Sequence, residues 1–193
     1  MSELARHIEN KAASDQTQKR VEEISAIYEI SQALNSVPID DLLSLITEKA
    51  AAVMDAHACS LMLKDPRRNE LVIKASYGLD EQIVESTRVA YGEGIAGRVA
   101  ASGEPMLLTN LSEDPRFAYS EVVPRPEIVS SICVPLRDTE GRVQGVLSIH
   151  RRYPAPLFTE DDVKVFSVFA SQAAQAVSNA HLYASLNEKV QEL

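Results

Sequence analysis

The chain has 193 residues, of which 45% are hydrophobic and 24% are charged, values typical of one soluble globular domain with helical extensions. Its formal charge of -9 argues against a nucleic-acid partner, because phosphate backbones bind cationic surfaces and no basic stripe is present. No apolar run is long enough to span a bilayer, and the N-terminus lacks the apolar stretch of a signal peptide. We therefore expect a cytoplasmic protein that does not insert into membranes.

Two helices are expected at the start of the chain. Apolar residues recur at steps of three and four between Asp15 and Asn35, which predicts an amphipathic helix. Its apolar stripe consists of Val21, Ile24, Ile27, Tyr28, Ile30 and Leu34. Pro38 then opens a second helix, a position where its missing amide costs nothing. The buried side of this second helix consists of Leu42, Leu43, Leu45, Ile46, Ala50 and Val53.

Short apolar runs follow, and they are typical of strands. Cys59–Leu63 and Leu71–Ala75 flank a turn that contains proline and asparagine, so they predict a hairpin. Extended segments are also expected at 87–90 and 106–108. Between them, a short helix should run from Ile95 to Ser102 and end at Gly103.

A long loop at 109–127 contains three prolines, and loops of this length are either functional lids or disordered. After it, Val129–Leu136 and Val143–His150 predict a second hairpin, joined by a turn at 138–141.

The last helix is expected to begin at Thr159, with Asp162 completing an approximate capping box, and to continue to Leu193. It carries a heptad seam of Val163, Phe166, Ala170, Ala173, Val177, Ala180 and Ala184. A second apolar stripe consists of Leu182, Leu186, Val190 and Leu193. One helix with two apolar sides needs two partners, which favours a parallel homodimer through the terminal helices. The alternative is an intramolecular helix pair.

The second hairpin separates two kinds of surface. If Arg137 faces Arg142, then Ile132 pairs with Leu147, Leu136 with Val143, and Cys133 with Val146. One face is then entirely apolar and should carry the first and last helices; it collects Ile132, Val134, Leu136, Val143, Leu147 and Ile149. The other, here called the mixed face, collects Val129, Ser131, Cys133, Val146, Ser148 and His150. This face suits a small-ligand pocket. The alternative is a filled core in which the serines bond to backbone.

Three blocks of sequence resemble the GAF family in order and spacing: Gly92–Ala100, Ser130–Leu136, and Gly145–Ile149 followed by Phe158–Asp162. The resemblance implies an α+β fold. In that fold a GAF-like central antiparallel sheet has the N- and C-terminal helices on one face, while a short helix and a long loop cover a pocket on the other. We expect three parts: an N-terminal signalling helix (1–36), the GAF sensor domain (37–181) and the start of a C-terminal coiled-coil linker (182–193).

The resemblance also implies that the pocket lies on the mixed face. The candidate ligand-binding residues are Ser60, Ser76, Ile95, Ala96, Phe117, Ser131, Cys133, Ser148 and His150. Among them, the helix N-terminal amides of Ile95 and Ala96 suit an anionic group. The motif of cyclic-nucleotide-binding relatives is incomplete, because its asparagine–lysine pair reads His150-Arg151 and its second acidic residue is Val163. Arg151 and Asp162 are still expected to form the structural ion pair of that motif.

Other chemistries receive less support from the sequence. Gly92-x-Gly94-x-x-Gly97 matches a dinucleotide fingerprint, but it lacks the βαβ context, so we interpret these glycines as turn residues. No cluster of metal ligands and no catalytic motif is present, and haem or bilin is unsupported, so the cofactor is unknown and no enzyme activity is expected.

These observations predict a domain that senses a small molecule, a gas or a redox change and signals to an output domain. The alternatives are a non-binding GAF dimerisation module, or a redox or nitric-oxide sensor acting through Cys133.

Overall fold

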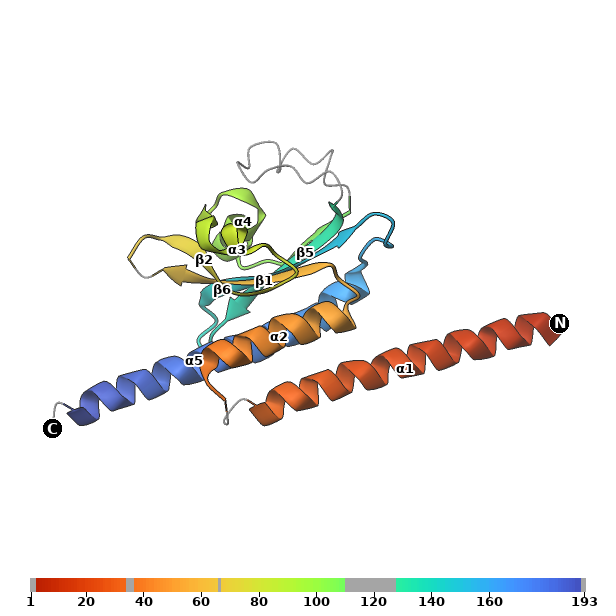
Figure 1. The fold of residues 1–193 in the computed structure, drawn as a ribbon, viewed down its shortest axis with the longest axis horizontal. Coiled ribbons are helices and arrows are strands. Elements are labelled where there is room, and N and C mark those ends of the chain that lie inside the picture. Colours follow the sequence, from red (N-terminus) through yellow and green to blue (C-terminus); the bar gives the residue numbers. More distant parts are fainter. Residues whose placement is uncertain (1–2, 34–36, 66, 110–127, 192–193) are drawn as a thin grey trace.

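A single antiparallel sheet forms the centre of the protein (Figure 1). The computed structural model describes residues 3–33, 37–65, 67–109 and 128–191, and side chains within these ranges from residue 11 to residue 182. The strands are β1 (Ala58–Asp65), β2 (Glu70–Tyr77), β3 (Arg88–Ala90), β4 (Met106–Leu108), β5 (Ile128–Arg137) and β6 (Val143–Arg152). Their order in the sheet is β3-β2-β1-β6-β5-β4. Both predicted hairpins are confirmed, and so is the α+β class.

The helices divide between the two faces of the sheet (Figure 1). They are α1 (Glu3–Ala33), α2 (Ile39–Val53), α3 (Glu81–Ser86), α4 (Gly94–Ser102) and α5 (Glu160–Gln191). Helices α2 and α5 pack on one face, and α3 and α4 lie on the other. The six-residue α3 was not predicted from the sequence.

The N- and C-terminal helices lie on one side of the sheet, as predicted, but the first helix does not itself cover the apolar face. Helix α2 occupies that place beside α5, and α1 lies in an outer layer against these two helices (Figure 1). The reason is the width of the buried stripe. Helix α1 buries only Ala26 and Ile30 among its described side chains, whereas α2 buries six residues along its length.

The main hydrophobic core fills the space between the sheet and the pair α2 and α5. Its largest side chains are fully or almost fully buried: Leu42, Leu43, Ile46, Ile132, Leu147, Phe158, Phe166 and Phe169. Each such side chain stabilises the fold by roughly 1.5–3 kcal/mol relative to an exposed position. This core therefore holds the two helices firmly on the sheet.

The predicted pairing of β5 with β6 is wrong by two residues. Ile132 pairs with Ile149 rather than Leu147, and Cys133 pairs with Ser148. The turn contains one residue more than predicted, because Arg137 pairs with Val143. An irregularity next to Leu136 adds a second extra residue to β6, because Leu136 pairs with Gly145. Because side chains alternate along a strand, a shift of two leaves the two faces unchanged.

Val143 is the exception, because it lies beyond the irregularity. It was predicted on the apolar face, but it packs against the cluster on the mixed face. Its neighbour Gln144 instead points to the helices, where its Nε2 donates to the Ala174 carbonyl at 3.0 Å and contacts Ser178 Oγ at 3.1 Å. A β-bulge reverses side-chain direction locally in this way.

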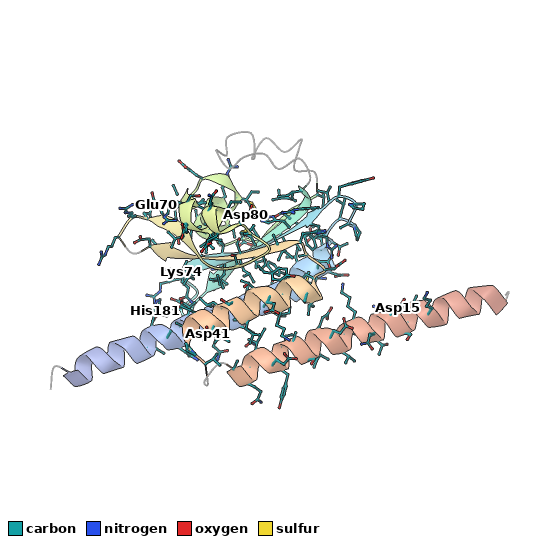
Figure 2. All side chains as sticks on the ribbon, in the orientation of Figure 1. Asp15, Asp41, Glu70, Lys74, Asp80 and His181 are labelled. Atoms are coloured by element: carbon teal, nitrogen blue, oxygen red, sulfur yellow. The ribbon has the colours of Figure 1, made fainter. Side chains whose placement is uncertain are left out.

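Part of α1 projects beyond the sheet layer, and Asp15 lies on this part (Figure 2). The predicted apolar stripe of α1 is largely exposed, with Val21, Ile24 and Tyr28 at 55%, 67% and 64%. Among the described residues, no helix has the length and apolar character needed to cross a membrane.

Candidate functional site on the mixed face of the sheet

Two neighbouring rows of side chains cross the mixed face of the sheet. The pairings of successive strands align the first row as Ser76, Ser60, Ser148, Cys133 and Met106. They align the second row as Ala58, His150, Ser131 and Leu108. The structure therefore brings together six of the nine candidate ligand-binding residues.

A smaller apolar cluster lies beside these rows, beneath α4. It contains Met62, Leu71, Val99, Ala100, Cys133 and Val146. Ile95 and Ala96, in the first turn of α4, pack against this cluster. They lie on the predicted side of the sheet, with their side chains as an apolar cover. Phe117 lies outside the described residues.

Ser131 and His150 face each other across β5 and β6 and share a hydrogen bond. Ser131 Oγ lies 2.9 Å from His150 Nδ1 and 3.0 Å from the carbonyl oxygen of Ile149. The Ser131 side chain is almost fully buried, and His150 is partly exposed. This contact fixes the orientation of the imidazole on the mixed face.

The first row contains hydroxyl groups in two different environments. Ser148 Oγ donates to Cys133 Sγ at 3.1 Å. Ser60 is only 6% exposed, yet its hydroxyl has no hydrogen-bond partner among the described residues. The fully buried side-chain oxygen that lacks a partner on this side of the sheet, among the described residues, is the Tyr91 hydroxyl beside the apolar cluster. Such an oxygen is unfavourable unless water or a ligand satisfies it.

Both cysteines are free and fully buried. Burial raises the pKa of the Cys133 thiol to about 12, and the weaker opposing effect is the hydrogen bond from Ser148. Burial also raises the pKa of the Cys59 thiol, which faces the helices. Reactive cysteines need a lowered pKa and an accessible sulfur, so these thiols have the character of core residues.

The glycine block has the structural role that the sequence predicted. Gly92 and Gly94 adopt φ values of 87° and 55°, a left-handed region that other residues rarely enter. A side chain at Gly97 would meet the Ala90 carbonyl oxygen at 2.1 Å. The three glycines therefore let α4 turn sharply and approach the end of β3.

Arg151 and Asp162 do not form the predicted ion pair. The buried guanidinium of Arg151 donates to the carbonyls of Met54 and Asp55, at 2.6 and 3.2 Å, where α2 ends. It also donates to the Pro156 carbonyl at 3.1 Å and lies 4.0 Å above the Phe158 ring. The orphan carbonyls of a helix C-terminus attract a cation, so they replace the carboxylate as the partner.

Asp162 instead caps α5. Its Oδ2 accepts hydrogen bonds from the amide and the hydroxyl of Thr159, at 2.8 and 2.9 Å, and its own amide bonds to Thr159 Oγ1 at 3.3 Å. The capping box is therefore confirmed. The cation near Asp162 is Lys19 of α1, whose Nζ lies 3.8 Å from Asp162 Oδ1.

Sequence reasoning missed Ser130, although it lies inside the block that carries the family resemblance. Its side chain is fully buried, donates to the Leu108 carbonyl at 3.0 Å and accepts from the Phe158 amide at 3.0 Å. It thereby joins β4, β5 and the segment before α5. A serine inside an apolar strand, on the helix-facing side, was the available signal.

The absence of a described metal-ligand cluster and the position of the described cavity bear on the chemistry of the mixed face. The described residues contain no group of His, Cys, Asp and Glu side chains arranged to hold a metal ion. A cavity of about 540 Å³ lies elsewhere, between α5 and the strand edge near Gly103 and Arg137. The polar groups described on the mixed face are hydroxyls, one imidazole and the ammonium of Lys64, which lies 4.6 Å from the centre of the Tyr91 ring.

The fold and the two-sided sheet are those of a regulatory domain of signalling proteins, and a model of the GAF domain family matches residues 38–177. The chain belongs to the GAF domain family. The GAF domain of a phosphoenolpyruvate-protein phosphotransferase from Acinetobacter is 28% identical, with a TM-score of 0.71 over 82% of this chain and 94% of that one. The corresponding domain from Coxiella burnetii is 25% identical, with a TM-score of 0.72 over 86% of this chain and 98% of that one.

Curated relatives are much longer proteins. A dual 3',5'-cyclic-AMP and -GMP phosphodiesterase 11 of Drosophila melanogaster is 29% identical over 86% of this chain. The nitrogen fixation protein AnfA of Azotobacter vinelandii is 27% identical over 82% of this chain. The matched region is 12% of the phosphodiesterase and 30% of AnfA.

Proposed function

We propose that this chain is a non-catalytic sensory input domain that binds a small molecule on the mixed face of its sheet. The binding event would be transmitted through the terminal helices to an output domain. The observation that carries the proposal is the division of one sheet into a helix-bearing apolar face and a face with aligned hydroxyls and a histidine.

Strand β6 provides a physical connection between the two faces. Ser148 and His150 lie on the mixed face, while Ile149 and Arg151 lie on the helix side. A ligand that stabilises one position of β6 would change the contacts of Arg151 with the end of α2. Such a ligand shifts a helix equilibrium only to the extent that it binds the two arrangements with different affinity.

Thermal unfolding with a panel of small metabolites tests the ligand half of the proposal. A specific ligand should raise the Tm with a concentration dependence that follows mass action. The expected shift should decrease in the Ser60→Ala variant and remain in Ser171→Ala, an exposed serine on α5. If Ser60→Ala leaves every positive shift unchanged, the binding site is not on the mixed face.

The dimer half of the proposal depends on the exposed stripe of α1. Val21, Ile24 and Tyr28 lie on the side of α1 opposite the buried Ala26 and Ile30. On α5, Leu182 is also exposed at 64%, while the side chains of Leu186, Val190 and Leu193 lie outside the described residues. Exposed apolar stripes on long helices are typical of helix–helix interfaces.

Sedimentation equilibrium of wild type and Ile24→Glu tests this interface. A dimer is expected for the wild type, with at least a tenfold weaker association for Ile24→Glu because a charge would be buried. Glu22→Ala, outside the stripe, is the control and should dimerise normally. A monomeric wild type, or equal association of all three proteins, would contradict the proposal.

The structure bears differently on the two alternative functions, a redox sensor and a dimerisation module without a ligand. A redox sensor at Cys133 loses support, because the thiol is fully buried and its pKa is raised. A dimerisation module without a ligand is distinguished by the same experiments, since it predicts a dimer in sedimentation and no ligand-dependent Tm shift.

A further inference from the structure

We infer that the cavity beside α5 is a second ligand site, which takes a small zwitterion of the free amino acid type. This site goes beyond the proposed function, because it lies between α5 and the edge of the sheet and shares no residue with the two rows of the mixed face. The inference is carried by the composition of the cavity wall and by two opposite charges in that wall which do not pair with each other.

The cavity has the size and the mixed lining of a small-ligand site. Its volume is about 540 Å³, within the range of roughly 300–1,000 Å³ that such sites occupy. The segment before β4 and the end of β5 with its following turn form one side, and α5 forms the other. Pro105, Val134 and Leu182 contribute apolar surface. The cavity can therefore accept the carbon atoms of a ligand as well as its polar groups.

Arg137 supplies a cation that is held in place. Its Nη1 donates to the Gly141 carbonyl at 2.8 Å, and its Nη2 donates to the Gly103 carbonyl at 2.7 Å. These bonds orient the guanidinium but use only two of its five N–H groups. Within the described residues, Arg137 has no carboxylate as an ion-pair partner. Its charge is therefore available to a ligand carboxylate, which a guanidinium binds through paired hydrogen bonds.

Glu104 supplies the opposite charge close to this cation. It directly follows Gly103, whose carbonyl accepts from Arg137, yet the two charged side chains form no ion pair. Asp138 also lines the cavity, but its carboxylate is already bonded to Arg142 at 2.9 Å. A ligand with a single charge would meet one group of its own sign, which is unfavourable. A molecule that carries both an ammonium and a carboxylate satisfies Glu104 and Arg137 together.

The α5 side of the cavity adds uncharged polar groups. Gln175 and Asn179 lie one helical turn apart, and their side-chain amides have no partner among the described residues. Ser178, between them, accepts a hydrogen bond from Gln144 Nε2 at 3.1 Å. Amides and hydroxyls of this kind favour an amino acid whose own side chain is polar and uncharged.

The position of the cavity gives such a ligand direct access to the helix proposed to carry the signal. Its wall includes α5 residues from Ser167 to Leu182, so an occupant contacts several turns of this helix. A ligand that binds one position of α5 more tightly than another shifts the helix toward that position. The domain would then have two inputs, one on the mixed face and one beside α5.

Calorimetry with three polar, uncharged amino acids tests the ligand class: L-serine, L-asparagine and L-glutamine. Each is compared with its carboxamide, which lacks the carboxylate, and with its N-acetyl derivative, which lacks the ammonium. Any amino acid that binds should do so at least tenfold more tightly than both derivatives. Binding by none of the three, or equal binding of a derivative, would refute the inference.

Variants on the two sides of the sheet separate this site from the mixed face. Glu104→Gln should weaken amino acid binding at least tenfold, whereas Glu81→Gln, an equal charge change at an exposed position of α3, should not. Arg137→Gln should have a similar effect; because it also removes two backbone contacts, Glu104→Gln is the decisive variant if Arg137→Gln does not fold. Ser60→Ala should bind as the wild type does. Binding that is lost in Ser60→Ala but kept in Glu104→Gln would place the ligand on the mixed face and overturn this inference alone.

Discussion

The two faces of the sheet are built from the same strands but use their side chains differently. On the helix-facing side, the residues of β5 and β6 pack into a continuous apolar core with α2 and α5. On the mixed face, the alternate residues include serines, a cysteine and a histidine, and α4 packs on the apolar cluster that contains Cys133 and Val146.

This difference separates stability from recognition. Apolar burial on one side supplies most of the folding free energy, so the other side can keep a polar group such as the Tyr91 hydroxyl without a partner among the described residues. Substitutions on the helix-facing side should therefore lower the free energy of unfolding, whereas substitutions of the polar residues on the mixed face should mainly affect ligand binding.

The largest effect is expected on the helix-facing side at Phe166. Its ring is fully buried against the sheet, so Phe166→Ala should lower the free energy of unfolding by about 3–5 kcal/mol through lost burial and a cavity. Urea denaturation measures this loss. Val168→Ala, at an exposed position of the same helix, should change the free energy of unfolding by about 0.5 kcal/mol or less. Similar losses in the two variants would show that α5 is not held by this core.

Arg151 tests whether hydrogen bonds also stabilise the helix side. Arg151→Met keeps much of the apolar stem but removes the donors that satisfy the carbonyls at the end of α2. The expected loss is about 1.5–3 kcal/mol, the range for hydrogen bonds to a charged group. Arg152→Met, at the next position, should change the free energy of unfolding by less than about 0.5 kcal/mol in the same urea titration.

A matched pair of serines compares the two faces directly. Ser130 joins Leu108 to Phe158, so Ser130→Ala leaves a buried carbonyl and a buried amide unpaired and should cost about 1–3 kcal/mol. Ser60→Ala removes a hydroxyl with no described partner, so the free energy of unfolding should stay the same or rise slightly. If Ser60→Ala proves the more destabilising of the two, the contrast between the faces is incorrect.

The smallest effect concerns the cap of α5. Asp162→Ala should lower the free energy of unfolding by about 1 kcal/mol through the loss of the capping box with Thr159. A double-mutant cycle with Arg151→Met should be additive within about 0.5 kcal/mol, because the two side chains have separate partners. A larger coupling energy would indicate that Arg151 and Asp162 interact directly, as the family resemblance implied.

The sequence predicted the strand faces well because alternation is a local property. The separation of Ile132 and Val134 from Ser131 and Cys133 follows from the strand period alone, and it tolerated a two-residue error in register. The helix starts after Pro38 and Thr159 were also predictable, because the fixed φ of a proline and the capping box of Thr159 are both local properties. The family resemblance added the arrangement of these elements around one central sheet.

What the sequence could not predict depended on contacts between distant segments. The partners of Arg151 lie 96 and 97 residues earlier in the chain, at the end of α2, and no local pattern shows that those carbonyls lie nearby. The bulge that turns Val143 away from the helices depends on the exact length of the turn. The outer position of α1 is set by competition with α2 for the same surface, and that competition is decided by the packing of the whole core.

The alternation along the last strand has a practical consequence for protein engineering. Four consecutive residues, Ser148 to Arg151, alternate between the two faces, so each face can be altered at two positions while the other keeps its side chains. Libraries at Ser148 and His150 would explore new specificities on an intact scaffold, and libraries at Ile149 and Arg151 would adjust the output helices for a fixed specificity.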